Sequence, residues 1–258
     1  MPSPELTFVL GLTLLLGYFI EGLGIYSAVI FAIPIAAVFL GVKVMVAVVS
    51  LVDFVMSYVN YHRIPKRADM GPVKRDLNVM LFGTFTGCML LWLIYDEVLL
   101  ILLGLLIIAS SYDYLSNGRL LNRISKKPVH SKPGKSSLKT IFLAGVSGGM
   151  FAFSRPPLFM HLSGKYGDAT EVIDSTSSSF LFYDSLFRCI LLAALGFIDL
   201  SVLLFSLFMM PFILVGIYAG RTKVELSIIY IRRLISLSLL LFGVIMVLWN
   251  IYAAYMIL

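Results

Sequence analysis

Residues 145–161 limit how this chain can fold, because helix-breaking residues interrupt a long apolar run there. The stretch reads Gly-Val-Ser-Gly-Gly-Met-Phe-Ala-Phe-Ser-Arg-Pro-Pro-Leu-Phe-Met-His, with three glycines, two adjacent prolines and an arginine. Inside a helix, glycine costs about 1 kcal/mol and proline about 3 kcal/mol relative to alanine. We therefore expect two half-helices that meet at a break around Phe153–Pro157, rather than one continuous helix.

The second half-helix is expected to start at this break. A proline suits the first turn of a helix, and the residue before it is disfavoured in the α region. Arg155 therefore marks the start, with Pro156 as the first helical residue. The N–H groups of Leu158 and Phe159 would then be free, and together with the charge of Arg155 they would form an anion site. Transporters bind substrate at broken helices of this kind.

The composition places the chain among polytopic membrane proteins. Sixty per cent of the residues are hydrophobic and 13% are charged, which is typical of that class. The first apolar stretch lacks a positive n-region and a cleavage pattern, so we expect it to be retained. Cys88 and Cys189 lie in apolar segments and the three histidines share no spacing, so we expect no disulfide, metal site or cofactor.

Six segments have the roughly 20 apolar residues that a membrane span needs. They are 43–61, 77–95, 98–115, 174–196, 200–220 and 233–256. Two further stretches, 9–40 and 140–164, are interrupted by glycine and proline. We predict that each of these two is a hairpin of broken helices.

The basic residues predict the orientation of the spans. Loops 62–76, 116–139 and 221–233 hold 16 of the 20 lysines and arginines, so all three are expected to be cytoplasmic. They are also expected to set orientation rather than to bind nucleic acid. If these loops share one side, the two hairpins must be re-entrant and both termini lie outside. Eight full spans remain an alternative.

The fold class predicted from this order is an all-α membrane protein built from two inverted-topology repeats. The first repeat is 1–115 and the second is 140–258, each consisting of a hairpin followed by three spans. The basic stretch 116–139 would be the cytoplasmic linker. A repeated order with reversed charge bias is typical of secondary transporters.

Several short motifs support a family resemblance. They are the glycine-rich segment Gly17–Pro34, then Gly145, Gly148 and Gly149, Pro156-Pro157-Leu158, the Gly196–Asp199 turn, Pro211, Gly216 and Gly220-Arg221. The chain resembles the sulfite exporter TauE/SafE family, also called the sulfonate uptake permease family. The resemblance implies transport of small sulfur-containing anions, such as sulfite or organosulfonates, across a prokaryotic cytoplasmic membrane. Tyr26-Ser27-Ala28 and Ser154-Arg155-Pro156 stand where runs of glycine would be usual, which leaves the substrate open.

The predicted substrate site combines the two breaks with polar positions on two spans. Its residues are Ser154, Arg155, Pro156, Pro157, Leu158, Tyr26, Ser27, Ser50, Thr176 and Ser177. Arg155 either binds the anion or forms a structural pair, for which Glu21 is the candidate partner. The serines at 175–179 either donate to oxyanions or pack helices together as small residues.

The predicted coupling or gating residues are Glu21, Asp53, Asp184, Arg188 and His161. Glu21 is a proton carrier, a partner of Arg155 or a residue near the outer mouth. Ser50, Asp53 and Ser57 share one helix face. Asp184 and Arg188 are four residues apart, so they are expected to neutralise each other. His161 is expected to be a satisfied polar residue rather than a proton carrier.

These observations predict a secondary transporter that moves a small anion by alternating access. No P-loop is present, so coupling to an ion gradient is favoured over ATP. No Gly-x-Ser-x-Gly or His-Glu-x-x-His motif occurs, so an enzyme is disfavoured. An anion channel and a membrane scaffold or assembly protein remain alternatives. The expected partners are the anion and the lipid bilayer, with homodimerisation left open.

Overall fold

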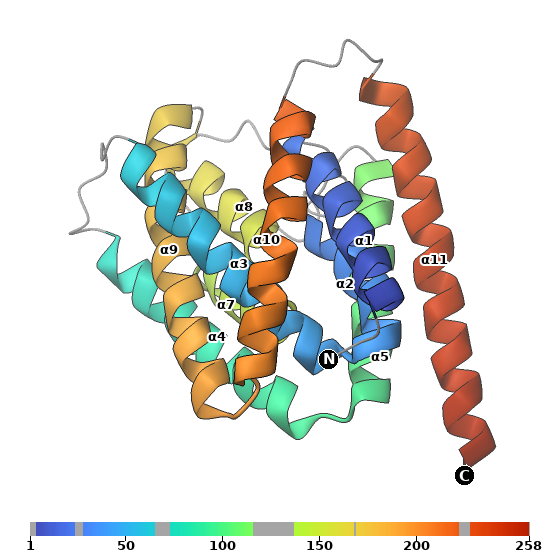
Figure 1. Cartoon of the computed structure of the whole chain (residues 1–258). Helices are drawn as coiled ribbons and strands as arrows, with labels where there is room; N and C mark the ends of the chain where they lie inside the picture. The colour runs from blue at the N-terminus through green and yellow to red at the C-terminus, as the bar shows by residue number, and fades with distance from the viewer. Residues whose placement is uncertain are drawn as a thin grey trace. The chain divides into compact units, whose positions relative to one another are not determined.

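The computed structural model describes residues 4–23, 28–64, 73–115, 137–167, 169–221 and 228–257. All regular secondary structure in these residues is helical, which confirms the predicted all-α fold class (Figure 1). The helices are α1 (Pro4–Gly22), α2 (Ala28–Leu40), α3 (Val42–Arg63), α4 (Lys74–Leu93), α5 (Asp96–Leu115), α7 (Leu138–Phe151), α8 (Arg155–Tyr166), α9 (Thr170–Ala194), α10 (Leu200–Arg221) and α11 (Ile228–Ile257).

Six of the described helices are long and apolar enough to cross a membrane: α1, α3, α4, α9, α10 and α11. Five of them coincide with predicted spans. The sixth, α1, has 19 residues and lies where we expected part of a hairpin. Helix α5 covers the predicted span 98–115 but is not among the six. The chain is therefore a multi-pass membrane protein, and the inverted orientation of its halves stays a prediction.

Pro34 does not interrupt the first hairpin as the sequence suggested. Helix α2 continues through this proline from Ala28 to Leu40. A membrane helix tolerates proline where its surroundings satisfy the freed carbonyl group. The first half is instead interrupted between Gly22 and Ala28. The predicted site residues Tyr26 and Ser27 fall there, outside the described residues.

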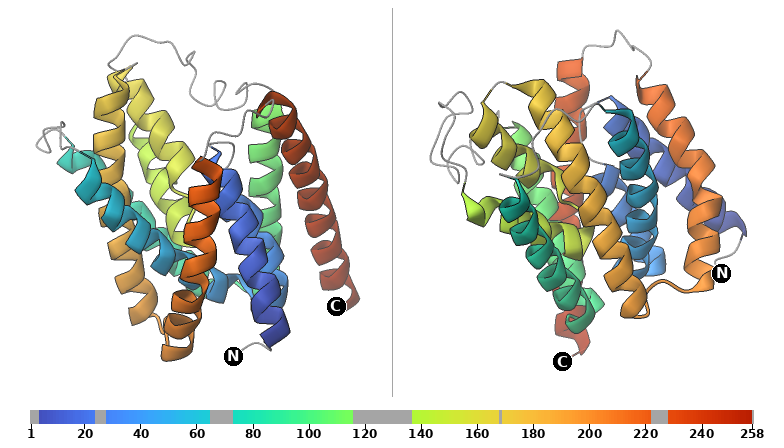
Figure 2. Two further views of the ribbon diagram at one scale, coloured as in Figure 1. Left: turned by 45° about the horizontal axis from the view of Figure 1, so that its top comes forward. Right: turned by 90° about the vertical axis from the view of Figure 1, so that its left-hand side faces the viewer.

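The helices group into two compact units, and each unit draws on both halves of the chain. The first unit contains α1, α2, α5, α11 and the part of α10 from Phe208 onward. Within it, α1 packs so closely on α10 that a Cβ at Gly220 would lie 2.3 Å from the carbonyl oxygen of Phe19. Helices α5 and α11 lie side by side in the same unit, with Gly104 and Gly243 at their contact (Figure 2).

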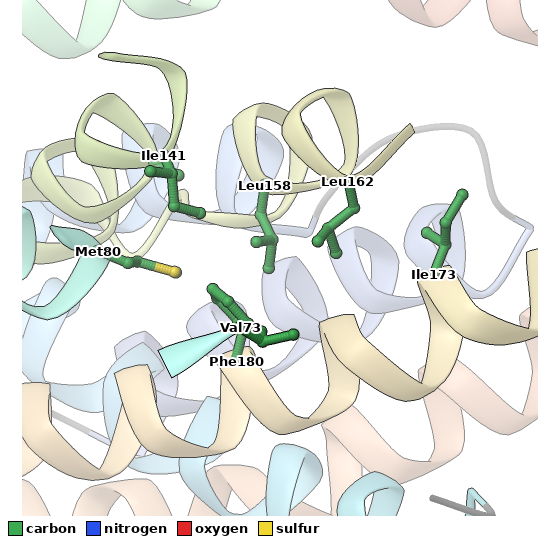
Figure 3. Close-up of a cluster of buried hydrophobic side chains, with 8 residues drawn as sticks. Val73, Met80, Ile141, Leu158, Leu162, Ile173 and Phe180 are labelled. Carbon is green, nitrogen blue, oxygen red and sulfur yellow. The ribbon is translucent and has the colours of Figure 1, made fainter. Parts of the chain in front are cut away.

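The second unit contains α4, α7, α8, α9, most of α3 and the start of α10. An apolar core holds four of its helices together, and Figure 3 shows these side chains converging. The core consists of Val73, Met80, Ile141, Ala144, Leu158, Leu162, Ile173 and Phe180. Because lipid is as apolar as leucine, packing rather than exclusion from water drives such contacts in a membrane. The core fixes α8 against α4, α7 and α9.

Helices α4 and α7 of this unit approach each other through glycines. Gly83 and Gly87 on α4 face Gly145 and Gly149 on α7. A Cβ at Gly145 would lie 2.0 Å from the carbonyl oxygen of Met80, which is far inside van der Waals contact. Glycines four residues apart lie on one helix face and allow backbones to touch. This contact brings α4 close to the break that follows α7.

Candidate functional site

The break between α7 and α8 covers residues 152–154, within the region that the sequence predicted. Ala152 adopts a left-handed conformation with φ 54°, and its N–H donates to the carbonyl oxygen of Gly148 at 2.8 Å. Ser147 forms hydrogen bonds to the turn through both its backbone and its side chain. Its carbonyl oxygen accepts from the N–H of Phe153 at 3.2 Å, and its hydroxyl donates to the carbonyl oxygen of Phe153 at 2.8 Å. These bonds satisfy backbone groups that the interrupted helix leaves open.

Helix α8 starts at Arg155, but it does not offer the free N–H groups that we expected. Pro156 and Pro157 have no N–H, and the N–H of Leu158 donates to the carbonyl oxygen of Ser154 at 3.1 Å. The prediction of a free N–H at Leu158 is therefore wrong, because two prolines use up the positions where free donors would lie. The Leu158 side chain is fully buried in the apolar core.

Four charged side chains instead form a row beside the break, which we call the charge row (Arg155, Asp53, Arg188 and Asp184). A terminal guanidinium nitrogen of Arg155 lies 3.8 Å from Asp53 Oδ1. The second oxygen of Asp53 accepts a hydrogen bond from Arg188 at 3.2 Å. Arg188 in turn lies 3.6 Å from Asp184 Oδ2. Two arginines and two carboxylates give the charge row no net charge.

Thr84 on α4 and the carbonyl oxygen of Gly148 hold the buried end of the charge row. The hydroxyl of Thr84 donates to Asp184, and Arg188 donates to the carbonyl oxygen of Gly148 at 2.8 Å. This carbonyl lies near the C-terminus of α7, where the helix dipole favours a positive charge. A Cβ at Gly148 would lie 3.0 Å from Ser154 Cβ and 3.4 Å from Asp184 Oδ2. Arg188 thus binds the break to α9.

Exposure rises along the charge row from α9 to α8. The side chains of Arg188 and Asp184 are 1% exposed, that of Asp53 is 12% exposed and that of Arg155 is 28% exposed. A charged side chain at membrane depth faces protein or a water-filled cavity, because hydrocarbon does not solvate it. Arg155 is therefore the more exposed of the two cations in this cluster.

The structure places Arg155 beside Asp53 and confirms the predicted partner of Arg188. Arg155 lies 3.8 Å from Asp53. The carboxylate of Glu21 accepts a hydrogen bond from the N–H of Ala28 at 2.7 Å. Glu21 thus caps the start of α2, where the dipole favours an acidic group. The predicted i, i+4 pair of Asp184 and Arg188 is present, although Arg188 is also shared with Asp53.

The hydroxyl groups of the predicted site point mainly to their own helices. Ser50 donates to the carbonyl oxygen of Val46 at 2.6 Å, and Ser177 donates to that of Asp174 at 3.0 Å. Back-bonded hydroxyls of this kind satisfy themselves within a helix. Thr176 is different: it is fully buried, and its hydroxyl has no hydrogen-bond partner among the described residues.

His161 belongs to a separate polar cluster on α8, as a satisfied residue. Its Nδ1 lies 3.2 Å from the carbonyl oxygen of Ser137, and its Nε2 lies 3.0 Å from Asp76 Oδ2. Lys165 donates to the same oxygen of Asp76 at 2.7 Å. This cluster ties the far end of the hairpin to the first turn of α4.

Thr84 and the role of Gly148 were not predicted from the sequence. The spacing of Gly83 with Gly87, and of Gly145 with Gly149, could have predicted that α4 and α7 touch. Because Thr84 follows Gly83 on α4, that contact would have predicted that Thr84 lies beside the break. Within the described parts of the chain, no group of three His, Cys, Asp or Glu side chains could hold a metal ion.

Comparison with known proteins gives one match. A family model described as "Sulfite exporter TauE/SafE" matches residues 9–246, a range that contains the break and the whole charge row. No match was found among curated proteins or solved structures.

Proposed function

Because the chain belongs to the sulfite exporter TauE/SafE family, we propose that it is a secondary transporter for a small sulfur-containing anion such as sulfite or an organosulfonate. Its energy source would be an ion gradient across a prokaryotic cytoplasmic membrane. The observation that supports this proposal best is the partly exposed guanidinium of Arg155 at the break between α7 and α8.

The chemistry of Arg155 suits such an anion. A guanidinium presents paired N–H donors in a plane, and these match two oxygens of a sulfonate, sulfite or carboxylate group. Neighbouring Asp53 holds Arg155 at 3.8 Å, which is longer than a hydrogen bond. An anion with good geometry can therefore replace a weak contact with two charge-assisted hydrogen bonds.

The test compares anion binding by the parent and by variants at Arg155. Arg155→Gln removes the charge and should weaken sulfite or methanesulfonate binding at least ten-fold, which corresponds to about 1.4 kcal/mol. Arg155→Lys keeps the charge but loses the planar fork, so its affinity should fall between the two. Lys139→Gln is the matched control, because it removes an exposed positive charge from the same hairpin. Binding is measured by calorimetry and by ligand-dependent thermal shifts in detergent.

Three results would contradict the proposal. A folded Arg155→Gln protein that binds the anion as tightly as the parent places the substrate site elsewhere. Flux in proteoliposomes that neither saturates nor exchanges labelled for unlabelled anion indicates a channel rather than a carrier. A variant that loses fold stability while keeping its ligand response would make Arg155 a structural partner of Asp53.

A further inference from the structure

We propose that Asp53 takes up a proton when an anion binds at Arg155, so that the anion and a proton occupy the site together. This inference rests on the proposed function, because it takes Arg155 as the group that receives the anion. The coupling ion would be the proton, and Asp53 would be the residue that carries it.

Asp53 divides its carboxylate between Arg155 and Arg188. The contact with Arg188 is a hydrogen bond of 3.2 Å, and Arg188 is itself fixed by the carbonyl oxygen of Gly148 at 2.8 Å. The contact with Arg155 is 3.8 Å, and Arg155 is the most exposed member of the charge row. An arriving anion therefore competes with Asp53 for Arg155. The anion cannot take Arg188, which is 1% exposed.

Charge balance then requires a proton. The charge row holds two arginines and two carboxylates and is neutral. Adding a monoanion leaves one uncompensated negative charge in a largely buried cluster, and isolated buried charges are expensive. One proton from water, transferred to a carboxylate oxygen, restores neutrality. The full step brings in one monoanion and one proton, and it breaks no covalent bond of the protein.

Asp53 is the carboxylate placed to accept this proton. Asp184 keeps its partners when Arg155 turns to the anion, since it retains Thr84 and Arg188. Asp53 loses one of its two cations, and at 12% exposure its side chain is open enough to exchange protons with water.

The other groups that face Asp53 do not replace it in this role. Arg155 approaches it from α8, and Arg188, Asp184 and Cys189 approach it from α9. Arg188 holds its proton, and the thiol of Cys189 already donates to the carbonyl oxygen of Ser50. Two carboxylates left to share Arg188 titrate as a pair. Asp184 keeps the hydroxyl of Thr84 as a donor to its charged form, and Asp53 loses the charge of Arg155, so the geometry favours the proton on Asp53.

The experiment measures proton uptake on anion binding by purified full-length protein. The probe is methanesulfonate, because it is a monoanion that does not titrate between about pH 5 and 9, whereas sulfite does. Calorimetry in two buffers with different ionisation enthalpies gives the number of protons taken up per anion. We expect about one proton, and an affinity that falls about ten-fold for each unit of rising pH where Asp53 is ionised in the free protein.

Asp53→Asn keeps the shape of the side chain and removes its charge. We expect this variant to bind the probe without proton uptake and with an affinity that no longer depends on pH. Glu21→Gln is the control: it removes the carboxylate that caps α2 and should keep the proton uptake of the parent. Loss of uptake in Glu21→Gln, or its persistence in a folded Asp53→Asn protein, would overturn the assignment to Asp53.

If Asp53→Asn does not fold, proton uptake measured on the parent protein alone still tests the proposal. Anion binding without proton uptake refutes this inference and leaves the proposed function standing. Failure of the parent to bind sulfite, methanesulfonate or thiosulfate refutes the proposed function, and the coupling step falls with it.

Discussion

The substitution Gly145→Ala tests the close contact between α4 and α7 that positions the site. The new Cβ would lie 2.0 Å from the carbonyl oxygen of Met80, 2.8 Å from the backbone nitrogen of Thr84 and 2.9 Å from the Cα of Gly83. Ordinary van der Waals contact begins at 3.4 Å. All three neighbours are backbone atoms, so no side-chain rotation can relieve the clash. The two helices must separate by more than 1 Å.

The size of the effect follows from this geometry. Overpacking a well-packed core costs about 1–3 kcal/mol, and occasionally more. We expect the upper end, about 3 kcal/mol, because only a movement of whole helices makes room. For a chain of this size about 1 kcal/mol shifts Tm by about 2–4 °C, so Tm should fall by about 6–12 °C. The anion response should weaken too, because Thr84 next to the clash holds Asp184 of the charge row.

The assay is thermal unfolding in detergent, followed by circular dichroism with and without sulfite. Gly164→Ala is the matched control in the next helix of the same hairpin, because a Cβ there meets nothing within 4 Å. Alanine is also a better helix former than glycine by about 1 kcal/mol, so this control should be neutral or slightly stabilising. If Gly145→Ala unfolds at the same temperature as the parent and Gly164→Ala, the close contact of α4 with α7 is wrong.

Two further predictions concern the second polar cluster and the topology. His161→Gln should lower the free energy of unfolding by about 1–3 kcal/mol, because both donors of a glutamine amide lie on one nitrogen, whereas the two oxygens in the structure face separate ring nitrogens of His161. A denaturation curve equal to that of the parent would contradict this. In a background lacking Cys88 and Cys189, a single cysteine at residue 70 should be protected from an impermeant thiol reagent in whole cells, and one at Asp199 should react. The opposite pattern would refute a cytoplasmic 62–76 loop.

Several features of this protein follow from local sequence alone. The apolar composition and the lengths of the apolar runs predicted a multi-pass helical fold, since a span needs about 20 such residues whatever surrounds it. The prolines at 156 and 157 predicted the break before α8, because proline acts on its own backbone and on that of the preceding residue. The pair of Asp184 and Arg188 was also predictable, because helical spacing places them on one face.

Other features depend on which helix faces meet. The sequence could not reveal that Asp53 on α3 would lie between Arg155 and Arg188, at separations of more than 100 residues. It suggested Glu21 as the partner of Arg155, since a carboxylate in one hairpin can as well pair with an arginine in the other. In the structure, the carboxylate of Glu21 caps the start of α2, and Arg155 lies beside Asp53.

The nature of the candidate anion site was decided by tertiary structure as well. Sequence reasoning placed the anion on free N–H groups after Pro156, but the chain turns so that the N–H of Leu158 bonds to Ser154. The proposed site relies on the guanidinium of Arg155 instead, which lies beside Asp53 of α3. Local rules fix where a helix breaks, because they act within a turn of backbone. Which charged side chains lie together at the break depends on which helices pack against one another. The spacing of residues within one helix does not identify the helices that it contacts.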